Sequence, residues 1–167
     1  LKTYYDKVIE LSKEFSSFEI GFVDKSMNGR AIGLAKDAID NDSSMIEDID
    51  NDTITTIEKD ESKGESTIVQ NLDSFAPSTT PHDYQEETQV PQSDSISPDK
   101  TYVLRFDGGS RGNPGIAGCG MVLYDTNDGA EIWSGYQYLG ESNTNNEAEY
   151  MGLITGLQCA RSLGIQN

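Results

Sequence analysis

The sequence predicts an incomplete α/β fold, in which structured segments at the two ends flank a long acidic segment. Three observations lead to this prediction. Residues 100–167 alternate short apolar runs with turn residues and then enter a helical pattern. Residues 1–40 show apolar side chains at helical spacing. Residues 41–99 carry 15 acidic but only 2 basic side chains, so most of the formal charge of −17 lies there.

The amino-terminal region, residues 1–40, is predicted to fold as helix, strand and helix. Apolar side chains recur every three or four residues as far as Phe15, which is typical of an amphipathic helix. Residues 18–22 then alternate apolar with polar or small side chains, as a half-buried strand does. Asn28 can begin a second helix that reaches about Ile39. Because one strand cannot form a stable sheet alone, this region needs a partner.

The middle region, residues 41–99, is predicted to be an acidic disordered linker with at most a transient local helix or turn. It combines its negative charge with four of the five prolines and few apolar side chains. Burial in such a segment cannot offset the entropy lost on ordering. A flexible chain of this length has a root-mean-square span of roughly 40 Å. The linker would therefore allow its two flanking regions either to meet or to stay apart.

The carboxy-terminal region, residues 100–167, is predicted to form an antiparallel three-strand meander followed by a helix. The predicted strands are the apolar runs at 102–106, 120–124 and 132–138. The helix begins at Thr144 and continues to about Leu163, with Gly164 just past its end. Thr144 and Glu147 have the spacing of a capping box, in which each satisfies a backbone amide of the other.

Asp107 is the first candidate for chemistry. It ends the first predicted strand and is followed by a run that is rich in glycine, Gly108 to Gly115. The mouth of a central strand is where α/β sheets place ligand-binding groups, and glycines allow a bulky ligand to approach the backbone. A tight turn with a solvated aspartate explains this run alone equally well. A Walker loop is disfavoured, because no Gly-Lys-Ser/Thr follows.

Glu149 is the second candidate, because it shares a helix face with Gly152 and Gly156. These small residues let the helix lie close to the sheet, which brings Glu149 near Asp107. Two carboxylates in one cleft form the beginning of a divalent-cation site. The alternative is that the glycines serve packing alone and that Glu149 is an ordinary first-turn acid favoured by the helix dipole.

Together, these segments resemble the amino-terminal half of a type 1 ribonuclease H domain, of the ribonuclease H-like superfamily. The resemblance is carried by the run from Phe106 to Gly118, by the three predicted strands and by the run from Thr144 to Tyr150. It implies metal-dependent endonucleolytic hydrolysis of the RNA strand of RNA–DNA hybrids, with Mg²⁺ or Mn²⁺ as cofactor. The family's first two acidic metal ligands, which are also catalytic, match Asp107 and Glu149.

The same resemblance implies residues that contact the hybrid in its minor groove. Its loop asparagines match Asn113, Asn145 and Asn146, and the neighbouring loop adds Gly108 and Ser110 as candidate substrate-binding residues. An asparagine side chain offers both a donor and an acceptor, which suits base edges and sugar 2′-hydroxyls. The 2′-hydroxyl is the group that distinguishes RNA from DNA.

The resemblance stops before the family's fourth strand, whose aspartate is the third metal ligand, and the last acidic ligand is missing as well. Residues 1–40 are similar to the carboxy-terminal end of the same domain type, but Ile32 stands where the family places its final aspartate. We therefore expect a fragment of a tandem protein: the end of a degenerate copy, an acidic linker and the head of a second copy. The fragment is predicted to be inactive alone.

Several alternatives and exclusions complete the prediction. A non-catalytic nucleic-acid-binding module or a protein interaction module, built on a degenerate ribonuclease H fold, is the alternative function.

No apolar run approaches the about 18 residues of a membrane span. The two cysteines, outside any CxxC pair, argue against a disulfide framework or structural zinc and favour an intracellular compartment. The strand at 102–106 has an open edge, where residues 18–22 are expected to dock.

Overall fold

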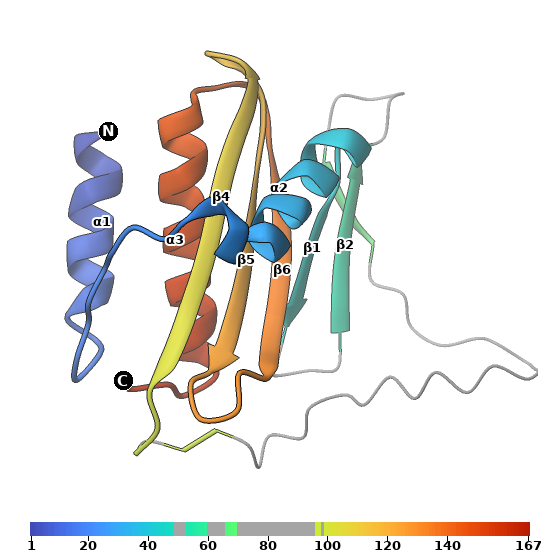
Figure 1. Cartoon of the computed structure of the whole chain (residues 1–167). Coiled ribbons are helices and arrows are strands. Elements are labelled where there is room, and N and C mark those ends of the chain that lie inside the picture. Colours follow the sequence, from blue (N-terminus) through green and yellow to red (C-terminus); the bar gives the residue numbers. More distant parts are fainter. Residues whose placement is uncertain (49–52, 60–65, 70–95, 98) are drawn as a thin grey trace, which may run out of the picture.

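One antiparallel sheet combines strands from the acidic middle region with strands from the carboxy-terminal region (Figure 1). The computed structural model describes residues 1–48, 53–59, 66–69, 96–97 and 99–167. Within these residues the strand order is β3-β2-β1-β6-β5-β4. The strands are β1 (Ser44–Asp48), β2 (Thr53–Lys59), β3 (Ser66–Val69), β4 (Tyr102–Gly112), β5 (Gly115–Asp125) and β6 (Glu131–Asn143). The helices are α1 (Lys2–Ser12), η1 (Lys25–Met27), α2 (Gly29–Asn41) and α3 (Asn145–Ser162). The predicted α/β class is confirmed.

The predicted meander is confirmed, and its strands are longer than the apolar runs that predicted them. β4 and β5 remain paired through the glycine-rich run, with Asp107 opposite Gly120 and Gly112 opposite Gly115. Local propensity favours a loop for such glycines. The ladder nevertheless continues here. Helices pack closely on both faces of the sheet at this point, and only small residues leave room for them.

α3 covers one face of the sheet and begins with the predicted capping box. The Glu147 amide donates to the Thr144 hydroxyl over 3.3 Å, and the Thr144 amide donates to the Glu147 carboxylate over 2.7 Å. The helix lies so close to β4 that a Cβ added to Gly108 would stand 2.2 Å from backbone atoms of Ala148 and Glu149. Gly108 therefore fixes the approach of the helix to the strand.

α2 covers the opposite face of the sheet. Its buried side is made mostly of small residues, and a Cβ added to Gly120 would stand 2.3 Å from the carbonyl oxygen of Ala31. α1 packs instead on the outside of α3, where Val8 and Leu11 join one apolar cluster with α3 side chains. These contacts supply the partner that the amino-terminal helices lacked in isolation.

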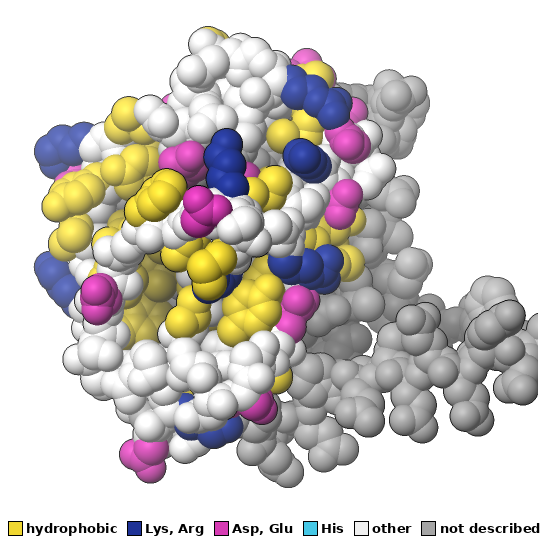
Figure 2. All heavy atoms as spheres, in the orientation of Figure 1, with side chains coloured by type: hydrophobic (Ala, Val, Ile, Leu, Met, Phe, Trp, Pro, Cys, Tyr) yellow, Lys and Arg dark blue, Asp and Glu magenta, His cyan; other side chains and the backbone are white. Residues whose placement is uncertain are grey.

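The strand predicted at residues 18–22 is wrong. Residues 17–23 run extended beside β4 but form no strand, and β4 remains an edge of the sheet. A hollow separates the two segments, so the backbone of residues 18–22 forms no strand ladder with β4. Phe22 is 95% exposed, and Figure 2 shows apolar side chains gathered on this face of the molecule.

The acidic region also differs from its prediction as a linker. β1, β2 and β3 all lie within it and extend the sheet beyond β6, with Met45 opposite Tyr136. The physical reason is local: β2 is rich in Thr and Ile, which favour strands, and β6 offers an open edge. Most of residues 70–99 lie outside the described part, so the predicted disorder there is not tested. None of the described helices has the length and apolar character needed to cross a membrane.

Candidate metal and nucleic-acid site

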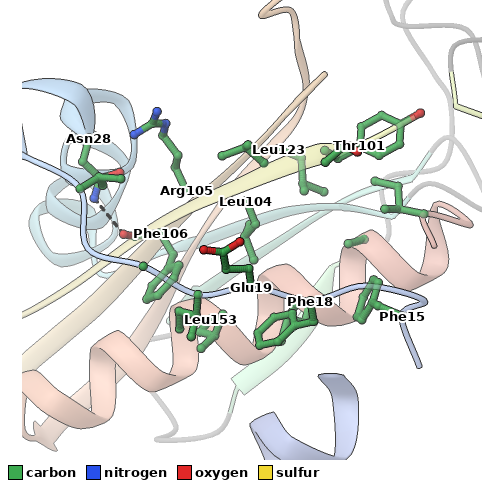
Figure 3. A pocket seen from close by; sticks show the side chains of 18 of the residues that line it. Phe15, Phe18, Glu19, Asn28, Thr101, Leu104, Arg105, Phe106, Leu123 and Leu153 are labelled. Carbon is green, nitrogen blue, oxygen red and sulfur yellow. Dashed lines mark hydrogen bonds between the residues drawn. The ribbon is translucent and has the colours of Figure 1, made fainter. Parts of the chain in front are cut away.

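Asp107 and Glu149 lie beside each other where α3 crosses β4. Asp107 belongs to the strand, Glu149 belongs to the helix, and the tight contact of Gly108 with the Glu149 amide joins the two elements. Both acids line one hollow of about 800 Å³. Figure 3 shows this hollow between β4 and the segment that carries Phe18 and Glu19. The convergence expected from the glycine stripe on the helix is therefore present in the fold.

The site raises the pKa of both carboxyl groups. Burial raises the pKa of Glu149, and the negative charge of Asp107 raises it further. Burial also raises the pKa of Asp107, although the charges of Lys25 and Lys36 act in the opposite direction. Each group binds its proton more tightly in the folded chain than in the unfolded chain. Their contribution to stability is therefore complete below the ordinary carboxyl pKa and is lost as the pH rises through the folded-state pKa.

Asp107→Asn is accordingly expected to increase the free energy of unfolding at neutral pH. The neutral side-chain amide of the variant avoids the cost of desolvating a charge, and it does not repel the Glu149 carboxylate. The advantage should disappear at about pH 3, where the wild-type carboxyl groups are protonated. Urea titrations of both proteins at the two pH values measure it. Asp6→Asn, on the exposed surface of α1, is the control. A variant that is less stable than wild type at neutral pH would contradict the electrostatic explanation.

The asparagines predicted to contact substrate surround the start of α3. The Asn145 amide donates to the Asn113 side-chain oxygen over 3.1 Å, which ties the β4–β5 turn to the helix. The Asn145 side chain donates to Glu149 over 3.5 Å, and Asn146 is exposed in the first turn. The other two predicted residues serve the interior. Gly108 is buried under α3, and the Ser110 hydroxyl donates to the Asn143 carbonyl over 2.9 Å.

The amino-terminal region contributes residues that the sequence prediction placed in a separate copy. The Asn28 side-chain amide donates to the Phe106 carbonyl over 2.9 Å, directly before Asp107 (Figure 3). Asn28 is only 8% exposed and lies at the amino-terminal end of α2, but its side chain does not cap that helix. Lys25 lines the same hollow as the acidic pair. The only sequence feature that pointed to this packing of residues 1–40 beside Asp107 was their similarity to the carboxy-terminal end of the same domain type.

Oxygen ligands are what Mg²⁺ and Mn²⁺ prefer, and Mg²⁺ commonly takes one or two carboxylates while water and substrate phosphate fill its other positions. Asp107 and Glu149 fit that donor set. Among the described residues, no group of three or more His, Cys, Asp or Glu side chains is arranged to hold a metal. A cation held by this pair would therefore need further ligands from elsewhere.

Comparison with known proteins matches the carboxy-terminal part of the chain. The family described as "Reverse transcriptase-like" matches residues 105–167. The bifunctional protein Rv2228c of Mycobacterium tuberculosis is 48% identical over 62 residues, which cover 37% of this chain and 17% of that protein. Ribonuclease HI of Halobacterium salinarum is 45% identical over 62 residues, which cover 37% of this chain and 30% of that protein. The chain thus spans less than a third of the length of these relatives.

Two solved structures match over the same extent. The N-terminal ribonuclease H domain of Rv2228c, fused to maltose binding protein, has 46% sequence identity and a TM-score of 0.37, covering 39% of this chain and 46% of that one. LC11-RNase H1 in complex with an RNA/DNA hybrid has 42% identity and a TM-score of 0.36, covering 38% and 45%. The ribonuclease H resemblance carried by the runs Phe106 to Gly118 and Thr144 to Tyr150 is confirmed by these sequence matches.

Proposed function

We propose, from the ribonuclease H resemblance of residues 105–167, that this part of the chain carries one half of a metal-dependent site that hydrolyses the RNA strand of RNA–DNA hybrids. Asp107 and Glu149 are the catalytic, metal-binding residues. One observation supports this above the others: the two carboxylates line the same hollow where α3 meets β4, and the charge of Asp107 acts on Glu149. A relative with 45% identity over 62 residues is named a ribonuclease HI.

In this proposal the two carboxylates hold Mg²⁺ or Mn²⁺ at the end of the hollow. A bound divalent cation supplies an activated water and stabilises the leaving oxygen of the cleaved phosphodiester. Asn145 orients the Glu149 carboxylate through its side-chain amide. Because the pKa of each acid is raised, cation binding must displace protons, and affinity rises with pH until both groups are ionised.

Substrate contacts are proposed at the start of α3 and at the β4–β5 turn. Asn113, Asn145 and Asn146 lie next to the acidic pair and offer donors and acceptors to the minor groove of a hybrid. Gly108 and Ser110 hold the strand, the turn and the helix in place. We propose that these two residues also contact the substrate directly.

The incompleteness of the site is proposed to follow from the open edge of β4. The Tyr102 amide donates to the Asn167 carbonyl over 3.3 Å, and the Phe106 carbonyl accepts from Asn28. Because alternate residues of a strand direct their backbone groups to the same edge, those of Leu104 face the hollow between these two contacts. An added strand would pair there and reach the acidic pair. We expect a chain extended beyond Asn167 by such a strand, ending in an aspartate, to gain a third carboxylate.

The chain of 167 residues is therefore expected to show no cleavage of a hybrid above the enzyme-free background. Two carboxylates leave the divalent ions and the phosphate insufficiently held for an in-line displacement. The test incubates the chain with Mg²⁺ and a hybrid labelled on its RNA strand, and separates the products on a denaturing gel. Robust magnesium-dependent cleavage that Asp107→Asn abolishes would show that the site is already complete.

A binding measurement with the same hybrid addresses the alternative function. Binding of the hybrid without cleavage, by both the 167-residue chain and the extended chain, would favour a non-catalytic binding module. We also propose that residues 1–40 and 100–167 derive from two copies of one domain type, although they pack together in this chain.

A further inference from the structure

α2 runs alongside the part of β4 that carries Asp107. At one end Asn28 bonds to the Phe106 carbonyl, and at the other end Asp40 forms an ion pair with Arg111. Between these anchors the helix rises about 18 Å and the strand about 17 Å, so the two elements span nearly the same length. A helix residue near the Asp40 end of this span therefore lies beside the segment of β4 that follows Asp107, between Gly109 and Arg111.

Lys36 occupies that position, because it lies one helical turn before Asp40. Lys25 reaches the acidic pair from η1, where it lines the hollow together with Asp107 and Glu149. The charges of both lysines act on Asp107, which agrees with this placement. Two cations from the amino-terminal region thus flank two acids from the carboxy-terminal region.

These lysines differ from most of the described cations near the sheet. Both are exposed, and neither forms an ion pair among the described residues. Four other cations are already engaged in the pairs Arg30–Glu131, Lys100–Asp125, Arg111–Asp40 and Arg161–Glu14. Lys25 and Lys36 therefore keep their charge available to a ligand.

We propose that Lys25 and Lys36 bind the phosphodiester backbone of the nucleic acid on the α2 side of the acidic pair. This inference rests on the proposed function and adds a second contact surface to it. A backbone phosphate approaching Asp107 and Glu149 meets repulsion, and two ammonium groups beside them offset it. A polyanion then spans from the asparagines at the start of α3 to the lysines of the amino-terminal region.

The test measures binding of a fluorescent RNA–DNA hybrid by anisotropy, with the full chain and Mg²⁺, from about 50 to 200 mM salt. Lys25→Ala and Lys36→Ala should each weaken binding by about tenfold at about 0.1 M salt and lower the salt slope by about one. Lys13→Ala is the matched control. Lys13 lies just after α1 and far from the acidic pair. Its neighbour Glu14 forms an ion pair with Arg161, which is about 18 Å along α3 from Glu149.

The outcomes separate this inference from the function on which it rests. If the wild-type chain binds the hybrid and both lysine variants keep its affinity and salt slope, the phosphate contact is refuted while the proposed function stands. If the variants lose affinity with an unchanged salt slope, the lysines serve only to hold the fold, which also refutes the contact. If the wild-type chain does not bind the hybrid at all, the proposed function fails first and the inference falls with it.

Discussion

Gly108→Ala is expected to lower the free energy of unfolding by about 3 kcal/mol or more. The added methyl carbon would stand 2.2 Å from the Ala148 carbonyl carbon and from the Glu149 amide nitrogen. These are backbone atoms near the capped start of a hydrogen-bonded helix, so they cannot move aside as a flexible side chain would. The only relief is to separate α3 from β4, which also separates Glu149 from Asp107.

Urea unfolding of the wild type and of two alanine variants measures this effect. Gly33→Ala is the matched control, because Gly33 lies inside α2 and its added Cβ would meet nothing within 4 Å. That substitution should stabilise the chain by about 0.5–1 kcal/mol through the better helix propensity of alanine. Equal stability of Gly108→Ala and wild type would mean that the strand and the helix are not packed as described.

The second large effect concerns catalysis in a chain extended beyond Asn167 by a strand that ends in an aspartate. We expect this chain to cleave a hybrid with Mg²⁺, and Asp107→Asn to reduce its rate by at least about a hundredfold. The amide has the shape of the carboxylate but lacks the charge that holds the cation. Initial rates on a hybrid labelled on its RNA strand give the ratio.

Asp128→Asn controls for the loss of one acid, because Asp128 lies in the turn between β5 and β6, away from the site. It should retain the rate of the extended chain. If Asp107→Asn cleaves within a few-fold of that rate, Asp107 is not a metal ligand and the catalytic assignment is wrong.

Local sequence patterns were sufficient for the meander and for α3. The short apolar runs of β5 and β6, and the Thr144–Glu147 capping box, are determined by neighbours in the chain. The pairing of Asp107 with Glu149 was also predictable, because small residues on one helix face require close approach to a strand. The pattern could not show that Gly108 is the point of closest contact, since that depends on the docking of two elements.

Long-range contacts could not be predicted from the patterns. Asn28 and Phe106 are 78 positions apart, and their hydrogen bond depends on residues 1–41 docking on residues 99–167. Lys25 and Lys36 were missed for the same reason. Residues 18–22 have the alternation of a strand, but strand formation needs a ladder partner at the right distance. The acidic average of residues 41–99 concealed the β-favouring Thr and Ile side chains of β2.

Divalent-cation binding followed by NMR tests the central proposal most directly. Mn²⁺ added in small amounts to the isotope-labelled chain should broaden amide signals most strongly around Asp107 and Glu149. The combined substitution of Asp107→Asn and Glu149→Gln should remove that broadening while leaving the remaining spectrum in place. Broadening that is centred on the acidic region 41–99, or that survives the double substitution, would show that the converging carboxylates do not hold the metal.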